Sequence, residues 1–98
     1  MTTTTKCFAV MNGLPMYNER AKVGNAIIND IITYRVKGNW IFSVVTGTTP
    51  SSIKVIDLDS EITADSVRFY CKNEKNCTTD NVLTDDRRIF KVGNITYV

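Results

Sequence analysis

Apolar and polar residues alternate along much of this chain, which is the pattern of β-strands that are buried on one face. The segment 66–72 shows this most clearly, because it has one apolar side and one polar side. The apolar side holds Val67, Phe69 and Cys71, and the polar side holds Arg68, Tyr70 and Lys72. Similar stretches predict further strands at 6–11, 31–36, 40–45, 52–58, 88–92 and 95–98.

Two of these strands, 31–36 and 40–45, are joined by a short turn, and two registers compete. A three-residue loop over 37–39 would gather an apolar face of Ile32, Tyr34, Val36, Trp40, Phe42 and Val44. A two-residue turn at Gly38-Asn39 would instead form a basic-aromatic platform of Arg35, Lys37, Trp40 and Phe42. Because register follows the buried face, we favour the first arrangement and expect Trp40 in the core.

The last part of the chain predicts a β-hairpin. The segment 88–92 and the segment 95–98 flank Gly93-Asn94, and glycine in the first position of a two-residue turn suits type II′. This register would set Val92 opposite Ile95 and Phe90 opposite Tyr97.

The segment 18–28 is ambiguous between a short helix and a strand. Asn18 would be a suitable N-cap, and Glu19 would lie near the positive end of the helix dipole. Gly24 weakens the helix, and a strand at 21–28 that turns at Asn29-Asp30 fits about equally well. Both alternatives stay open.

Composition agrees with a β-rich fold. Ile, Val and Thr make up 33 of the 98 residues, and their branched side chains suit a pleated surface. A chain of this length holds one core. We therefore expect a single mainly β domain over 6–98, after a flexible lead-in at 1–5. It would be an antiparallel barrel or sandwich of about six to seven short strands, with a possible short helix at 18–28.

The sequence gives little support for a catalytic site or a metal site. The chain has no histidine, which excludes Ser-His-Asp and Cys-His machinery as well as mixed Cys/His zinc sites. The acidic run 57–65 fails the EF-hand pattern, because Ile62 and Arg68 stand where glycine and glutamate are needed. We expect no catalytic residue, no metal and no cofactor. A hydrolase that uses Asp57 and Asp59 is the remaining enzymatic alternative.

The three cysteines are Cys7, Cys71 and Cys77, an odd number that is too small for a disulfide scaffold. A Cys71–Cys77 disulfide remains an alternative to free thiols.

The apolar run after Lys6 is too short for a signal peptide, and no run is long enough for a membrane helix. We therefore expect a cytoplasmic protein that does not contact a membrane.

Charge gives a weak indication of nucleic-acid binding. The net charge is only +2, and the acidic middle of the chain lies between two mildly basic ends. The charged quartet at 85–88 should pair locally. The candidate binding residues are Arg35, Arg68, Tyr70, Lys72, Arg87, Arg88 and Lys91.

By elimination, the sequence favours a non-enzymatic module that docks on a protein partner. Homo-oligomerisation through an edge strand is possible as well. The small size, the many Asn, Ile and Thr residues and the lack of histidine resemble accessory proteins from AT-rich phage genomes. That resemblance implies an inhibitor or modulator of a host enzyme, or a component of virion assembly. The alternative is a small nucleic-acid-binding β-barrel of SH3-like or OB-like shape.

Overall fold

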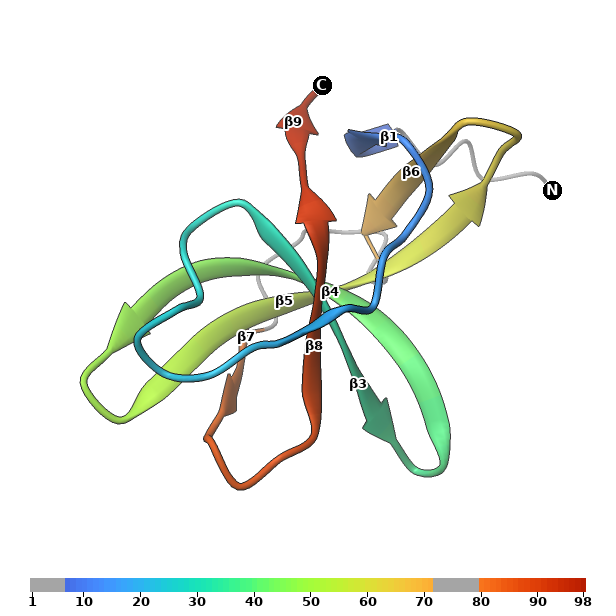
Figure 1. Ribbon diagram of the computed structural model, residues 1–98. Coiled ribbons are helices and arrows are strands. Elements are labelled where there is room, and N and C mark those ends of the chain that lie inside the picture. The colour runs from blue at the N-terminus through green and yellow to red at the C-terminus, as the bar shows by residue number, and fades with distance from the viewer. Residues whose placement is uncertain (1–6, 72–79) are drawn as a thin grey trace, which may run out of the picture.

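The computed structural model describes residues 7–71 and 80–98, which form nine β-strands and no helix (Figure 1). The expected mainly β, antiparallel fold is confirmed, with more strands than predicted. The strands are β1 (Cys7–Asn12), β2 (Glu19–Arg20), β3 (Asp30–Val36), β4 (Asn39–Thr49), β5 (Ser52–Ile62), β6 (Ser66–Cys71), β7 (Asp80–Leu83), β8 (Ile89–Asn94) and β9 (Thr96–Tyr97). No helix in these two ranges is long and apolar enough to cross a membrane.

The strands form one antiparallel sheet in the order β2-β8-β3-β4-β5-β6-β1-β9, and the two ends do not pair, so the barrel is not closed. β5 divides the sheet in two. Its first half pairs with β7 over 53–56, and its second half pairs with β6 over 58–62. We call β2, β8, β3, β4 and the first half of β5 the large half-sheet. The second half of β5 with β6, β1 and β9 forms the small half-sheet.

Both faces of the large half-sheet are buried around the first part of β3, which explains why Asp30–Tyr34 are buried without alternation. The face that carries Ile31, here called the Ile31 face, packs against β1 and β6. The opposite face, called the Ile32 face, lies under residues 21–26 and β7. The first core includes Ala9, Met11, Val44, Leu58, Val67, Phe69 and Val92, and the second includes Ala21, Ala26, Val45, Ile53, Val55, Leu83 and Ile89.

The favoured register of the β3–β4 hairpin is wrong. The turn is Lys37-Gly38, with φ of 51° and 84°, and Arg35 lies opposite Trp40. Trp40 is 49% exposed, so the expectation of a core tryptophan is also wrong. The rival grouping of Arg35, Trp40 and Phe42 on one face is found, but the turn comes one residue earlier than it required. The pattern of polar and apolar residues gave the wrong register because a strand that is buried on both faces has no single apolar side.

The predicted C-terminal hairpin is also wrong, because β8 and β9 do not pair with each other. β8 pairs with β3 and β2, while β9 crosses to the small half-sheet and pairs with β1. Ile95 lies at the crossing, is 8% exposed, and donates its N–H to the carbonyl of Asn29 at 3.1 Å. Gly93 is needed for another reason than a turn: a Cβ there would collide with the Met11 side chain.

The segment 18–28 is neither a helix nor a strand over 21–28. Only β2 is extended, and the rest forms a loop around Gly24, whose φ is 103°. Asn25 stabilises this loop, because its side chain accepts from the N–H of Lys22 at 2.7 Å and donates to the carbonyl of Arg20 at 2.9 Å. These bonds satisfy the backbone groups that a helix would have used.

Candidate binding groove

The Ile31 face of the large half-sheet is only half covered. β1 and β6 bury its first part, around Ile31 and Val44. Further along the same strands the face emerges, and there it forms a groove of about 480 Å³. The residues that line the groove are Tyr17, Thr33, Trp40, Phe42, Ile62 and Phe90. The hydroxyls of Thr33 and Tyr17 and the indole N–H of Trp40 are the polar side-chain groups in an otherwise apolar lining.

Two guanidinium groups stand beside the aromatic rings of this groove. The Trp40 and Phe90 rings have centroids 6.1 Å apart. The Cζ atom of Arg35 lies 5.9 Å from the centroid of Trp40, and that of Arg20 lies 5.9 Å from the centroid of Phe90. Both distances suit cation–π attraction. The groove is therefore aromatic inside and positively charged at its rim.

Backbone carbonyls hold both arginines in place. Arg35 donates to the carbonyl of Gly38 at 3.1 Å, and Arg20 donates to the carbonyl of Arg87 at 3.1 Å. Each guanidinium has five N–H donors, so both keep several for a ligand.

A second hollow, of about 400 Å³, adjoins the groove at Trp40 and Phe42. It forms because the pairing of β4 with β5 ends at Phe42 and Leu58. Beyond this point the strands diverge: β4 curves away to the β3–β4 turn, and β5 runs to the β5–β6 turn (Figure 1). We call this hollow the β4–β5 cleft. Its lining is completed by Ile41, Leu58, Asp59 and Ser60.

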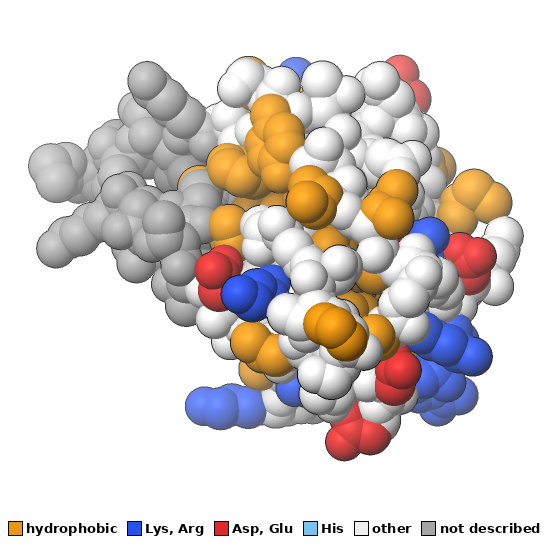
Figure 2. Space-filling model, turned by 90° about the vertical axis from the view of Figure 1, so that its left-hand side faces the viewer, with side chains coloured by type: hydrophobic (Ala, Val, Ile, Leu, Met, Phe, Trp, Pro, Cys, Tyr) orange, Lys and Arg blue, Asp and Glu red, His pale blue; other side chains and the backbone are white. Residues whose placement is uncertain are grey.

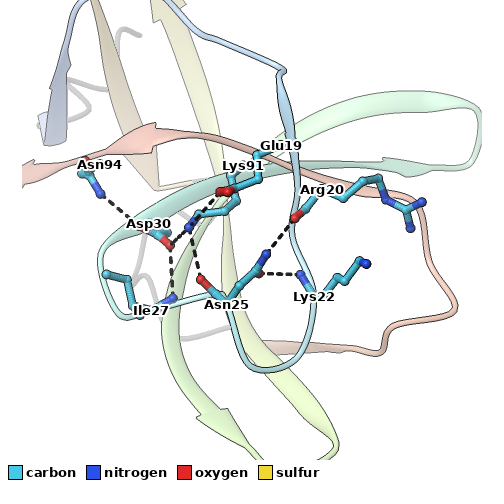
Figure 3. A network of polar contacts seen from close by, with 8 residues as sticks. All are labelled: Glu19, Arg20, Lys22, Asn25, Ile27, Asp30, Lys91 and Asn94. Carbon is cyan, nitrogen blue, oxygen red and sulfur yellow. Dashed lines mark hydrogen bonds and ion pairs between the residues drawn. The ribbon is translucent and has the colours of Figure 1, made fainter.

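A polar network on the Ile32 face fastens the loop 21–29 to β8 (Figure 3). The Lys91 ammonium lies 3.5 Å from the carboxylate of the buried Asp30 and 3.3 Å from that of Glu19, and it donates to the carbonyl of Asn25 at 3.1 Å. Partial burial opposes the charge of Lys91, but the two carboxylates outweigh it and raise its pKa above the ordinary value. Lys91, one of the predicted binding residues, thus makes structural contacts with Glu19, Asp30 and Asn25.

Asp30 is 1% exposed and is held by further donors. Its carboxylate accepts from the N–H of Ile27 at 3.1 Å and from the Asn94 side chain at 3.0 Å. With Lys91, these contacts satisfy a buried charge that would otherwise be costly.

A second polar cluster lies between β3, β4, β5 and β7. Asp57 accepts hydrogen bonds from the hydroxyl of Tyr34, from Ser43 at 2.7 Å and from Asn81 at 2.5 Å. Burial, and next the hydrogen bond to Asp57, raise the pKa of Tyr34 to about 12. Asp57 therefore serves as a shared acceptor within the sheet, whereas Asp59, the other acid of the hydrolase alternative, is exposed.

The structure distributes the predicted binding residues over several surfaces. Arg35 lies at the rim of the groove, and Arg88 is exposed just before β8. Arg87 lies over the ring of Tyr34, on the Ile32 face, at 5.0 Å from the ring centroid. Arg68 and Tyr70 lie on β6, directly across from Glu61 and Asp59 of β5. Lys72 lies outside the described residues, as does Cys77 of the Cys71–Cys77 alternative, and the thiol of Cys7 is free.

The expected local pairing within the quartet 85–88 is not found. Asp85 accepts from the backbone N–H of Val23 at 2.5 Å, and Arg87 donates to the carbonyl of Arg35 at 2.7 Å. Asp85 thus contacts the loop 21–29 and Arg87 contacts β3, instead of each other. On the face shown in Figure 2, basic and acidic side chains are interspersed and hydrophobic ones form separate patches.

The sequence did not identify most of the groove. Its rim residue Arg20 and its lining residues Tyr17, Ile62 and Phe90 come from three separate parts of the chain, 17–20, β5 and β8. The signal that existed was the rival register of the β3–β4 hairpin, which brought Arg35, Trp40 and Phe42 together. In the described part of the chain, no group of three or more Cys, Asp or Glu side chains could hold a metal ion.

Comparison of the chain with family models, with curated proteins and with solved structures finds no match. Function is therefore inferred from the groove itself.

Proposed function

We propose that the protein is a non-enzymatic binding module that docks on a protein partner through the aromatic groove. The observation that carries this proposal is Trp40, which is 49% exposed at a concave apolar surface and flanked by the guanidinium of Arg35. Tryptophan, tyrosine and arginine are the residues most enriched among those that dominate binding energy at protein interfaces. Burial of such a side chain by a partner removes a large apolar area from water.

Acidic side chains near the β4–β5 cleft also favour a protein partner. Asp59 lines the β4–β5 cleft beside Trp40, and Glu61 follows two residues later. Nucleic acid would meet repulsion there, whereas a protein segment can vary its charge along its length. We propose that the module acts inside the cell as an accessory protein, either as a modulator of an enzyme or as a component of an assembly.

The test is a capture experiment from nuclease-treated lysate, with tagged wild type compared with Trp40→Ala. Val82→Ala is the matched control, since Val82 is 58% exposed but lies on β7, outside the groove. We expect the control to retain the protein that wild type captures and Trp40→Ala to lose most of it. Equal capture by Trp40→Ala would refute docking through the groove.

The second candidate is binding of single-stranded nucleic acid. It is favoured by the two arginine–aromatic pairs, because bases stack on exposed rings and phosphates attract arginine. Oligonucleotide binding that quenches Trp40 and weakens steeply between about 50 and about 200 mM salt would support this candidate. Absence of such binding would remove it.

A further inference from the structure

The two walls of the β4–β5 cleft each have a strand edge without a neighbour. β4 and β5 pair only as far as Phe42 and Leu58. Beyond this point, residues 39–41 of β4 remain paired with β3, and residues 59–62 of β5 remain paired with β6. Each wall is thus paired on one edge and open on the edge that faces the cleft.

On the β4 wall, the open backbone groups belong to Trp40. In a hairpin with a two-residue turn, the residues that flank the turn exchange both backbone hydrogen bonds, and every second pair repeats this. Val36 and Asn39 flank the turn here, so Ile41 also bonds to β3. The N–H and C=O of Trp40 therefore point away from β3. Among the described residues, no backbone hydrogen bond from another element reaches them.

On the β5 wall, the open groups belong to Ser60 and Ile62. The β5–β6 turn is closed by a hydrogen bond from the N–H of Thr63 to the carbonyl of Ser66 at 2.8 Å. The same alternation makes Glu61 and Asp59 the residues that bond to β6. The N–H and C=O groups of Ser60 and Ile62 consequently point into the cleft, and no other described element supplies them with a partner.

We propose that the cleft takes up an extended segment of the partner protein as an added β-strand, which pairs with Ser60 and Ile62 on the open edge of β5. This inference rests on the proposed docking function and specifies its geometry. An open strand edge presents a row of donors and acceptors that another extended chain matches without distortion. Here such an edge lies next to the apolar groove, so a bound strand can pair through its backbone and bury its side chains at the same time.

Charge complementarity defines the side chains of that segment. Side chains of a strand alternate, so every second one points to the Ile31 face, where the groove lies. One of these contacts Trp40 and Phe42 and must be large and apolar. A side chain two positions along lies near the guanidinium of Arg35, beside Trp40, which attracts a carboxylate. The expected ligand is thus an extended segment with an apolar and an acidic residue two positions apart.

The probe for the test is a short fluorescein-labelled peptide of alternating valine and threonine that carries phenylalanine and glutamate two positions apart. Binding is followed by fluorescence polarisation and by the emission of Trp40, the single tryptophan of the chain. Ser60→Pro removes the backbone N–H that faces the cleft, and Ser60→Ala is its matched control because it keeps that N–H. We expect Ser60→Pro to lower affinity at least about tenfold, the equivalent of one hydrogen bond, and Ser60→Ala to stay within about twofold of wild type.

A charge exchange tests the side-chain requirement. Arg35→Glu should weaken binding of the glutamate probe about five- to tenfold and strengthen binding of a probe with lysine in its place. Arg68→Glu changes the net charge equally but lies on β6, outside the groove, and should leave both affinities within about twofold. Circular dichroism and the melting temperature verify that each variant is folded.

Each failure has a distinct meaning. No saturable binding of the glutamate probe to wild type, or equal affinities of Ser60→Pro and Ser60→Ala, would overturn strand addition. The docking function would survive that result if Trp40→Ala still lost the captured protein. Displacement of the probe by an oligonucleotide, or a wild-type dimer that Ser60→Pro dissociates, would overturn the proposal in favour of nucleic acid or of a second copy of the chain.

Discussion

Tyr34 donates its phenolic hydrogen bond to Asp57 across the large half-sheet, and its burial together with this contact makes stability depend on alkaline pH. The pKa of Tyr34 rises from 10.0 to about 12 in the folded protein, so folding favours the neutral phenol. That contribution is complete below about pH 10 and is lost as the pH rises towards 12. Two pKa units correspond to about 2–3 kcal/mol.

We therefore expect the free energy of unfolding of wild type to fall towards that of Tyr34→Phe as the pH rises from about 10 to about 12. Urea unfolding at a series of pH values measures both. The free energy of unfolding of Tyr17→Phe, a change at an exposed tyrosine, should vary with pH in the same way as that of wild type. A constant difference between wild type and Tyr34→Phe would contradict the role of the phenol.

Trp40 should behave as a solvent-accessible tryptophan in the native protein. Because 49% of it is exposed, its emission should be red-shifted relative to a core tryptophan and readily quenched by acrylamide. Trp40→Ala should cost less than about 1 kcal/mol, as expected for a surface position. Phe69→Ala, at a fully buried ring of the first core, should cost about 3–5 kcal/mol. Protection of Trp40 from acrylamide would mean that the groove is closed in solution.

Lys91 and Asp30 should be energetically coupled. Lys91→Met leaves the carboxylate of Asp30, 1% exposed, without its cation, which should cost about 3 kcal/mol. In the double variant Lys91→Met with Asp30→Asn, the loss should be smaller than the sum of the two single losses by at least about 1 kcal/mol. Urea unfolding of the four proteins measures this coupling. Additive losses would show that the ion pair does not stabilise the loop 21–29.

A side chain at Gly93 would force the side chain of Met11 to shift. A Cβ at Gly93 would overlap the sulfur of Met11 and lie 3.3 Å from its Cγ, within a core where Met11 is 3% exposed. Gly93→Ala should therefore destabilise by about 1–3 kcal/mol. Combination with Met11→Ala removes the overlap, so the double variant should be more stable than the sum of the single changes predicts. Thermal unfolding distinguishes this result from simple additivity.

Lys37 occupies the first position of a turn that requires a positive φ at both central residues. Lysine adopts this conformation at a cost, whereas asparagine tolerates it. Lys37→Asn should therefore stabilise the protein by about 0.5–1 kcal/mol. Lys37→Gln removes the same charge without that tolerance and should give no gain. Equal melting temperatures for the two variants would argue against strain in this turn.

The sequence was sufficient for the class of fold but not for strand pairing. Alternation in 66–72 and the high content of Ile, Val and Thr correctly indicated an antiparallel β-protein. Pairing depends on contacts between distant segments, such as β9 with β1, that no local pattern reveals. The hairpin predicted at Gly93-Asn94 failed for this reason, since Gly93 serves a contact with Met11 rather than a turn.

The candidate groove was harder to predict than the fold because its residues converge only after folding. Polarity suggested burial for Trp40, and burial on both faces of β3 removed the contrast on which that inference depended. Arg35 was identified through the rival register of the β3–β4 hairpin, which placed it on one face with Trp40 and Phe42. Phe90 was assigned to a hairpin face, and Ile62 appeared only in a failed cation loop, so neither suggested a binding surface.

The division of β5 between two neighbours has a consequence for how the molecule comes apart. One continuous strand carries Val55 into the second core and Leu58 into the first, so neither core can be dismantled while the other keeps this strand intact. Heat or denaturant should therefore melt the large and small half-sheets in a single all-or-none step. A module built in this way would present its cleft either fully formed or not at all.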